Sequence, residues 1–455
     1  METRDSTLRP VPIPMAPPQG WGRRISERRG VQALAALVLY VLASILLFGI
    51  PVLRDIRHSY VGLGRPDLGT GFTDPSVYMW SLAWWPHALT HGLNPLFTHL
   101  VWAPQGVNLG WTTTVPGASI LAWPLTAWLG PVAAYNVWIL LAPALAGWTA
   151  YLLCRHVTAA FWPSLFGGYL FGFSSYELAQ MTAHLNLALI FPIPLAVLLV
   201  WLRIEGRLKP FPFVLMLATT IALQYSFSME IAFTLTLFGG LVGLLAIAVF
   251  PQARERLVRT AGWTAVSYLV AAAALAPFVL ALAGGSGFVP GTWHSKYTMD
   301  LLNLVIPTRT ILLRPPGSGG VAERFSAGLS EEGGYLGPTL LMVVLFAVRG
   351  IRTPAGKLLL GSLGVILVAS LGPSLRVAGV EQVPLPWALA THIPLVRMAL
   401  PARFMVHAWL VLGLLAALWL AAPSRKPWAG WGKWAVAGLC VVALLPNIAL
   451  PLWNA

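Results

Sequence analysis

Long apolar runs separated by short polar segments make up most of the sequence. The runs are about 15 to 22 residues long, close to the ~20 residues that a helix needs to cross a bilayer core of ~30 Å. The pattern predicts an all-α, polytopic membrane protein with about eleven spans, within a range of ten to twelve. The expected spans are 31–53, 132–153, 160–174, 185–203, 211–226, 231–250, 261–283, 335–348, 357–371, 402–421 and 433–452.

The segment 113–130 decides on which side of the membrane each later loop lies. It is short and contains two prolines, which weaken a helix interior. If it does not cross, 19 of the 29 lysines and arginines lie inside. If it crosses, only 13 do. Only the first arrangement obeys the positive-inside rule, so we expect 113–130 to lie on the outer surface or to re-enter it.

This topology divides the chain into a tail and one membrane domain. Residues 1–30 are polar, basic and rich in proline, which predicts a disordered cytoplasmic tail rather than a signal peptide. Residues 31–455 form a single transmembrane domain, with outer loops at 54–131, 284–334 and 372–401. The N-terminus is then cytoplasmic in a cell-membrane protein, and ten of the fifteen acidic residues face outside. Any chemistry is therefore expected on the outer face.

Composition excludes several classes of protein. Apolar residues make up 57% of the chain and charged residues 10%, against about 25% charged in soluble chains. The net charge of +14 belongs to membrane loops and does not indicate nucleic-acid binding. Two cysteines suggest no disulfide framework. Because Walker A, GxSxG, HExxH, CxxC and dinucleotide motifs are absent from the sequence, nucleotide-driven cytoplasmic chemistry is not expected.

Asp74 is the first candidate for catalysis. Thr73-Asp74-Pro75 is typical of a helix start, because aspartate caps the helix and proline suits its first position. The helix would bring Trp80, Trp84 and Trp85 together at the headgroup level. Asp74 then either simply caps an interfacial helix or also serves as a general base or metal ligand at the mouth of a membrane cavity.

Histidines on the same helix, and polar residues further along, form two weaker patterns. His87 and His91 stand four residues apart, a spacing that can hold a metal, although interfacial histidines are the simpler interpretation. The segment 174–189 contains Glu177, Gln180, His184 and Asn186, together with Tyr176, within apolar sequence. It is either a polar turn or a short helix that presents Glu177, Gln180 and His184 on one face.

Charged residues near the expected outer ends of later spans complete the candidates. Glu230 lies just inside an apolar run, so it either reaches water or needs a partner. Arginines in the outer loops break the charge rule and suit the binding of a phosphate or carboxylate, or of lipid headgroups without specificity. They are Arg309 and Arg314 in one loop, and Arg397 and Arg403 before the tenth span.

Several local motifs are similar to the large bacterial branch of the GT-C class of membrane glycosyltransferases. The resemblance covers about residues 31–420. The motifs are TDPSVYMW, NPLF, WAPQGVNL, AHLNL, YTMDLLNLVIPT, EEGGYLGP and VRMALPARF. The resemblance implies a GT-C-like fold with amphipathic helices in the first outer loop. It also implies transfer of a sugar, with inversion, from a polyprenyl-phosphate donor to a lipid-linked or cell-envelope glycan acceptor.

The resemblance also assigns roles to residues. Asp74 would activate the acceptor hydroxyl, and Arg397 or Arg403, with Arg309 or Arg314, would bind the lipid phosphate. Glu230 and His184 would shape the pocket. Further expected substrate contacts are Glu177, Asn186, Glu332 and Tyr335.

The sequence departs from the class at Pro75, since many members have two adjacent acids there. A divalent metal therefore stays an open question. The expected partners are the sugar donor, the acceptor and membrane lipids.

Two other functions fit the same residues. A lipid-linked glycan flippase would need a polar path through the bilayer and often shows repeated halves, and neither is evident in the sequence. An envelope glycan ligase or polymerase centred on the outer arginines is the second alternative. The Asp74 carboxylate distinguishes the transferase from this ligase. A transferase that activates a hydroxyl needs the carboxylate, whereas a ligase centred on arginines does not depend on it.

Overall fold

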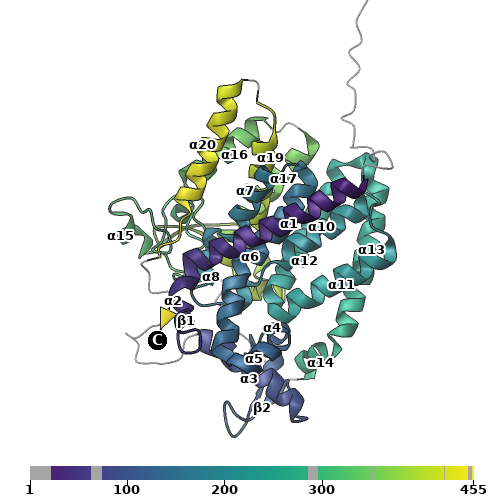
Figure 1. Cartoon of the computed structure of the whole chain (residues 1–455), viewed down its shortest axis with the longest axis vertical. Coiled ribbons are helices and arrows are strands. Elements are labelled where there is room, and N and C mark those ends of the chain that lie inside the picture. Colours follow the sequence, from purple (N-terminus) through teal and green to yellow (C-terminus); the bar gives the residue numbers. More distant parts are fainter. Residues whose placement is uncertain are drawn as a thin grey trace, which may run out of the picture.

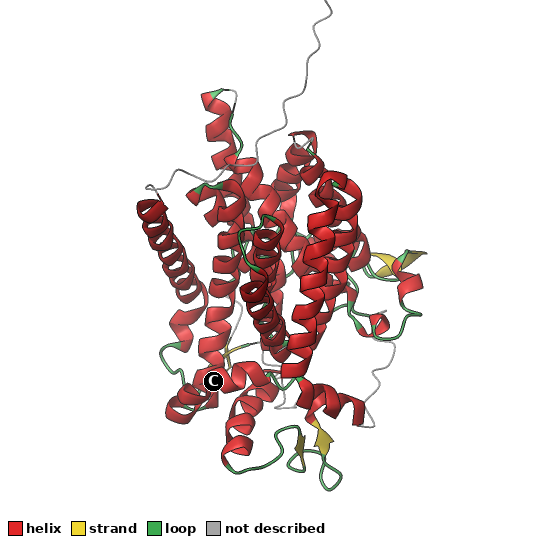
Figure 2. Ribbon diagram, turned by 90° about the vertical axis from the view of Figure 1, so that its right-hand side faces the viewer, coloured by secondary structure: helices red, strands yellow, loops and turns green. Residues whose placement is uncertain are grey.

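A computed structural model describes residues 22–62, 74–284, 296–350, 353–424, 426–448 and 453–454. The described chain is mostly helical, and its helices gather into one bundle with short strands at the periphery (Figures 1 and 2). Among these described residues, seven helical segments are long and apolar enough to cross a membrane: Arg29–Val52, Pro131–Thr158, Leu185–Ile204, Pro210–Phe227, Met229–Val249, Pro251–Ala274 and Pro401–Ala421. Each of the eleven expected spans overlaps a helix, but α7, α16, α17 and α20 are shorter than a full span, so the number eleven is not confirmed.

The longer helices follow one another along the chain, some directly and some after long loops. They are α1 (Gly22–Ser44), α3 (Asp74–Thr90), α6 (Pro131–Thr158), α7 (Phe161–Gly172), α10 (Pro192–Ile204), α11 (Pro210–Phe227), α12 (Met229–Val249), α13 (Arg254–Ala274), α14 (Ala276–Gly284), α16 (Gly337–Gly350), α17 (Pro354–Ser370), α19 (Met405–Ala421) and α20 (Pro427–Ala443).

Shorter helices cap or connect these. They are the π-helix Ile45–Gly49, α2 (Ile50–Val52), α4 (Pro116–Leu121), α5 (Trp123–Leu129), α8 (Ser175–Gln180), α9 (Leu185–Ala188), α15 (Ser318–Ala322), α18 (Trp387–Ala390) and the 3₁₀-helices Leu109–Trp111, Pro251–Ala253, Leu301–Leu304, Val396–Met398 and Pro401–Phe404.

The strands form three two-stranded antiparallel pairs. β1 (Tyr60–Val61) pairs with β6 (Trp453–Asn454), β2 (Phe97–Thr98) with β3 (Val107–Asn108), and β4 (Ser374–Val377) with β5 (Val380–Pro384). The last pair is a hairpin within the loop predicted at 372–401. These strands are too short to change the all-α class.

The first helix begins earlier than the hydrophobic pattern indicates. α1 starts at Gly22, so residues 22–30 are helical and do not belong to a disordered tail as predicted. The arginines and glutamate there are good helix formers, and a helix that is already nucleated extends into them at little cost. The rest of the predicted tail, residues 1–21, lies outside the described residues.

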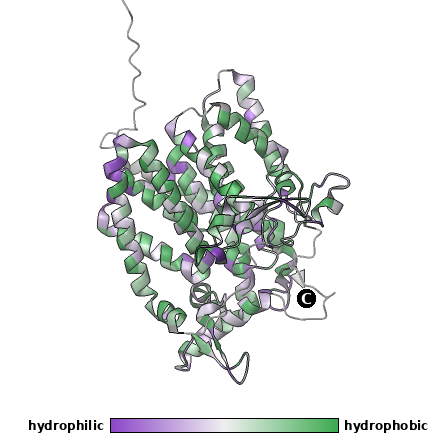
Figure 3. Ribbon diagram, turned by 180° about the vertical axis from the view of Figure 1, so that it is seen from behind, coloured by the Kyte–Doolittle hydropathy of each residue, from purple (hydrophilic) through white to green (hydrophobic). Residues whose placement is uncertain are grey.

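The first expected outer loop contains helices, as predicted. α4 and α5 occupy 116–129, and with six and seven residues neither is long enough to cross a bilayer. This matches the expectation that 113–130 does not span. α3, α4 and α5 lie together at one end of the bundle (Figure 1). Figure 3 colours the long helices mostly as hydrophobic, with strongly hydrophilic segments confined to a few places.

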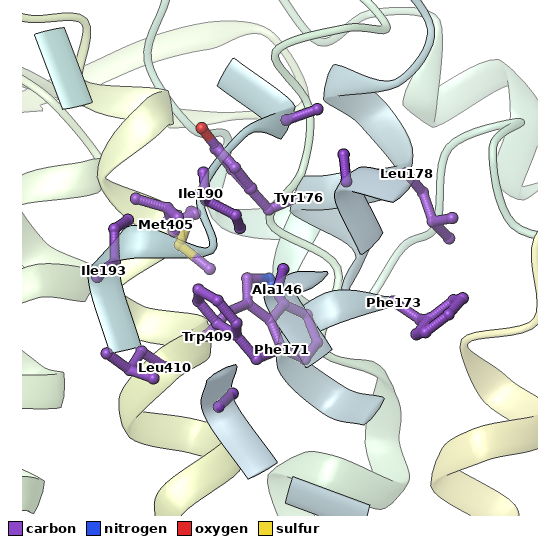
Figure 4. Packing of buried hydrophobic residues seen from close by; sticks show 14 of the residues in the cluster. Ala146, Phe171, Phe173, Tyr176, Leu178, Ile190, Ile193, Met405, Trp409 and Leu410 are labelled. Carbon is purple, nitrogen blue, oxygen red and sulfur yellow. The ribbon is translucent and has the colours of Figure 1, made fainter. Parts of the chain in front are cut away.

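The core of the bundle is built from α6, α7 and α19. Trp409 of α19 and Phe171 of α7 are fully buried, and Figure 4 shows them beside Ala146 of α6. Close packing depends on small residues where these helices meet. A Cβ at Gly167 of α7 would lie 2.6 Å from the carbonyl oxygen of Gly413 in α19.

Two glycine pairs, Gly168/Gly172 and Gly239/Gly243, have the small-xxx-small spacing that predicts close helix packing, and the first pair confirms it. A Cβ at Gly172 would overlap the carbonyl oxygen of Pro143 and the backbone of Gly147, both in α6. The second predicted pair, Gly239 and Gly243 in α12, has open space at its Cβ positions within the described chain. The packing interpretation of that pair is therefore not confirmed.

Replacing Gly172 by alanine should lower the stability of the protein, because the added methyl group would clash with the backbone of α6. Overpacking of this kind costs about 1–3 kcal/mol. Gly239→Ala is the matched control, since its methyl group meets nothing and alanine favours a helix over glycine by up to about 1 kcal/mol. Thermal melting of both variants in the same detergent measures the difference. Equal melting temperatures for the two would contradict the close contact of α6 and α7.

Candidate functional site

Asp74 lies at the N-terminal end of α3, as the sequence predicts, and its carboxylate contacts a histidine. The Nε2 atom of His184 is 3.0 Å from the Oδ2 atom of Asp74. The Asp74 side chain is 59% exposed, whereas that of His184 is 13% exposed. The hydrogen bond to His184 lowers the pKa of Asp74 below its usual value against the opposing effect of partial burial. A partly accessible carboxylate is thus held in its charged form.

Tyr78, one turn further along α3, makes a second link between the same two segments. Its hydroxyl donates a hydrogen bond of 2.5 Å to Oδ1 of Asn186, two residues after His184. Burial raises the pKa of the Tyr78 hydroxyl above its usual range, so this group stays a neutral donor. Because side chains four residues apart share one face of a helix, Asp74 and Tyr78 together fix α3 against 184–186.

His184 has polar partners on its inner side as well. Its Nδ1 atom lies 2.8 Å from Oε1 of Gln180, which ends α8, and 3.8 Å from Oε1 of Glu331. Gln180 also contributes to lowering the pKa of the Glu331 carboxyl. Gln180 and His184 therefore share a face, as the spacing indicates.

Glu177 takes no part in this group. Its side chain is fully buried, and neither carboxylate oxygen has a hydrogen-bond partner among the described residues. Burial raises the pKa of Glu177 well above its usual value, so it is held as the neutral acid.

The chain of charged groups continues from Glu331 to Arg403 and Glu230. The Nε atom of Arg403 is 3.0 Å from both carboxylate oxygens of Glu331, and its two terminal nitrogens contact Glu331 and Glu230. The second oxygen of Glu230 accepts a hydrogen bond of 2.9 Å from the backbone N–H of Leu400. The Glu331 side chain is only 3% exposed. Glu230 has found its partner in space, as its apolar surroundings require.

The charge of Glu331 is maintained against its burial. Desolvation raises the pKa of Glu331, but the Arg403 charge and hydrogen bonds to that guanidinium more than offset it, so the pKa lies below its usual value. Five segments far apart in sequence thus meet here: the start of α3, the 180–184 turn, the start of α12, the loop before α16 and the 3₁₀-helix before α19.

The other predicted site residues lie elsewhere. Asn186 belongs to the Tyr78 contact. Tyr335 is 5% exposed and belongs to the main hydrophobic core. Arg309, Arg314 and Arg397 are exposed.

Glu332 and the pair His87 and His91 have contacts of their own, outside the charged network. The backbone N–H of Gly328 donates a hydrogen bond of 3.0 Å to Glu332. His91 contacts the His87 carbonyl through Nδ1 at 2.9 Å, with the two rings 4.2 Å apart. No three histidine, cysteine, aspartate or glutamate side chains of the described chain group in a way that could hold a metal ion.

The tryptophans of α3, which are expected to lie together at the headgroup level, pack largely against protein. Trp80 and Trp84 stack with ring centroids 5.5 Å apart, but Trp84 and Trp85 are 5% and 4% exposed. The Nε1 atom of Trp84 donates to the carbonyl of Pro95, and Trp85 stacks on Phe278 of α14. The loop after α3 and the distant α14 cover this helix, so the rings anchor α3 to protein. Sequence reasoning could not foresee that cover, because it depends on long-range contacts.

Glu332 provides a pH-dependent prediction. Burial, with the nearby Asp300 charge, raises its pKa from 4.5 to about 7 despite the Gly328 hydrogen bond. A carboxyl whose pKa is raised by folding adds most stability below pH 4.5, and that stability is lost as the pH rises to 7. Glu332→Gln carries no charge and keeps an acceptor for Gly328. It should be more stable than the wild type at pH 8, by up to about 3 kcal/mol, and equal to it near pH 4.5.

Thermal melting across pH 4.5 to 8 tests this expectation, with the exposed Glu323→Gln as the control. A gap between Glu332→Gln and wild type that stays constant with pH would contradict it.

Comparison with known proteins gives a family that covers most of the helical chain but gives no activity. No curated protein matches the chain. The family defined by the domain of unknown function DUF6311 matches residues 36–445, which include every residue of the charged network described above. The chain therefore belongs to the DUF6311 family.

Proposed function

We propose that the protein is a membrane glycosyltransferase that moves a sugar from a polyprenyl-phosphate donor to a lipid-linked or cell-envelope glycan acceptor on the outer face. The observation that carries the proposal is the Asp74 carboxylate, held by His184 at the exposed end of a chain of charged groups whose other members are at most 20% exposed. A general base needs such a carboxylate, ionised and within reach of a substrate hydroxyl. The resemblance to GT-C enzymes supports the choice of reaction.

The proposed step conserves atoms and charge. The acceptor O–H gives its proton to the Asp74 carboxylate while the oxygen forms a bond to the anomeric carbon of the donor sugar. The bond between that carbon and the phosphate oxygen breaks, and its electron pair leaves with the polyprenyl phosphate. Attack from the side opposite to the phosphate inverts the configuration. Positioning and charge stabilisation contribute most of the rate in such a site.

The arginines differ in how well they suit the leaving phosphate. The Arg403 guanidinium is already bonded to two carboxylates, which reduces its capacity to bind another anion. Arg397 is exposed, and no ion pair is recorded for it within the described chain. Since it lies in the 3₁₀-helix just before Leu400, whose N–H is bonded to Glu230, we propose Arg397 as the phosphate-binding residue. The same pairing of Arg403 weighs against an arginine-centred ligase that would use it.

Reconstitution into lipid vesicles with a panel of polyprenyl-phosphate sugars tests the proposed function. We expect one donor to be consumed, with release of polyprenyl phosphate and transfer of its sugar to an added glycan or lipid acceptor. Arg397→Gln should weaken the use of that donor, whereas Arg256→Gln, at an exposed arginine of α13, should leave it unchanged. Movement of intact donor across the bilayer without cleavage would favour the flippase and overturn the transferase.

A further inference from the structure

The contacts of His184 with Gln180 and Asp74 determine where the hydrogens of its ring lie. Gln180 lowers the pKa of Glu331, as expected when its amide nitrogen is turned toward that carboxylate, which can only accept. The amide oxygen of Gln180 then faces Nδ1 of His184, which lies 2.8 Å away. Because an amide oxygen only accepts, Nδ1 of His184 must carry a hydrogen.

The hydrogen on Nδ1 determines what can lie between His184 and Asp74. A neutral imidazole with its hydrogen on Nδ1 presents a lone pair at Nε2. That atom is 3.0 Å from Oδ2 of Asp74, which is a carboxylate oxygen in the ionised form. Two lone pairs at this distance repel, so one proton must lie between them. The doubly protonated ring, hydrogen-bonded to Gln180 and Asp74, satisfies both contacts.

The surrounding charges favour the same state. The groups near the ring are the carboxylates of Asp74 and Glu331, with Arg403 and then Glu230 behind Glu331. With a neutral ring these four charged groups carry two net negative charges. With the doubly protonated ring the whole cluster carries one net negative charge. Tyr78 and Asn186, which approach from α3 and α9, are uncharged.

We propose that Gln180 and His184 are positioning residues that hold one proton between His184 and Asp74, so that the second oxygen of Asp74 is turned toward the acceptor hydroxyl. Gln180 is 1% exposed and acts through His184, which in turn orients a carboxylate that is 59% exposed. The catalytic part of this inference rests on the proposed function. The proton count, meaning that both ring nitrogens of His184 carry a hydrogen, does not.

Nuclear magnetic resonance of the ¹⁵N-histidine-labelled protein in detergent tests the proton count directly. The His184 signals are those lost in His184→Gln. We expect both ring nitrogens to carry hydrogens at pH 7 in the wild type. Gln180→Met removes the acceptor at Nδ1 and should shift these signals. Thr182→Val is the matched control, because Thr182 is buried two residues away and its hydroxyl donates, within the described chain, to the carbonyl of Ala179. A singly protonated ring in the wild type overturns the proposal.

The pH dependence of sugar transfer tests the positioning role. Gln180→Met and His184→Gln should each lower the rate roughly 10- to 100-fold, as misplaced catalytic groups do. The wild-type rate should fall at alkaline pH, where the ring loses its proton. His184→Arg, which keeps a permanent cation, should lose that alkaline fall.

A structural role alone would lower the rate by one factor at every pH and leave the profile unchanged, and that result would overturn the positioning role. If the histidine signals are as expected but no donor is consumed, the proposed function fails while the shared proton stands. The two failures are therefore distinguishable.

Discussion

Asp74→Asn should lower sugar transfer by about 10²–10⁴-fold, the usual contribution of a general base. An asparagine keeps an oxygen that can accept from His184 but cannot take a proton from the acceptor. Because the Asp74 side chain is 59% exposed, we expect the variant to fold and to melt close to the wild type. The measurement is the initial rate of transfer in vesicles with the donor identified from the panel.

Asp55→Asn is the matched control for this prediction. Asp55 also contacts a histidine, with its Oδ1 atom 2.8 Å from Nδ1 of His58, and its side chain is 53% exposed. The pair lies on the same predicted outer loop but apart from the charged chain. It should therefore keep the wild-type rate. Full activity in a folded Asp74→Asn would reduce Asp74 to a helix cap and favour the arginine-centred ligase.

Arg403→Met should give the largest loss of stability, about 3–5 kcal/mol. The change leaves the carboxylates of Glu331, which is 3% exposed, and Glu230, which is 20% exposed, without their cation. Unpaired buried charge is costly because the apolar surroundings solvate it poorly. Thermal or denaturant unfolding in detergent at pH 7 measures the loss.

Two companion measurements separate this cause from simple loss of packing. The triple change Arg403→Met, Glu331→Gln and Glu230→Gln removes the charges together and should recover most of the stability. In addition, Arg403 is the main group that holds the pKa of Glu331 below its usual value against burial, with smaller effects of His184 and Gln180. The stabilising effect of the ionised Glu331 therefore exists above that value and is lost as the pH falls. The deficit of Arg403→Met should therefore shrink below about pH 4.5. An undiminished deficit in the triple variant would show that packing is the cause.

Periodicity and local signals in the sequence were sufficient for much of the fold. The apolar runs predicted helices at the right places because burial in an apolar medium depends on residue type alone. Asp74-Pro75 marked the start of α3 correctly, since capping is a local property of the backbone. Gly168 and Gly172 likewise indicated close helix packing. By contrast, the helical start at Gly22 was not predicted, and the number of eleven spans is not confirmed, because helix ends extend or fray with little change in free energy.

The sequence by itself also determined which residue types were worth examining, including Asp74, His184, Glu230 and Arg403. Only the tertiary structure decided how they pair. It brings Asp74 to His184 and both Glu230 and Glu331 to Arg403, across up to 173 positions of sequence. It buries the Glu177 carboxyl with no hydrogen-bond partner among the described residues. It also buries Trp84 and Trp85 against protein. The physical reason is that ion pairing, burial and proton sharing depend on distances between segments, which folding sets and which no local pattern contains.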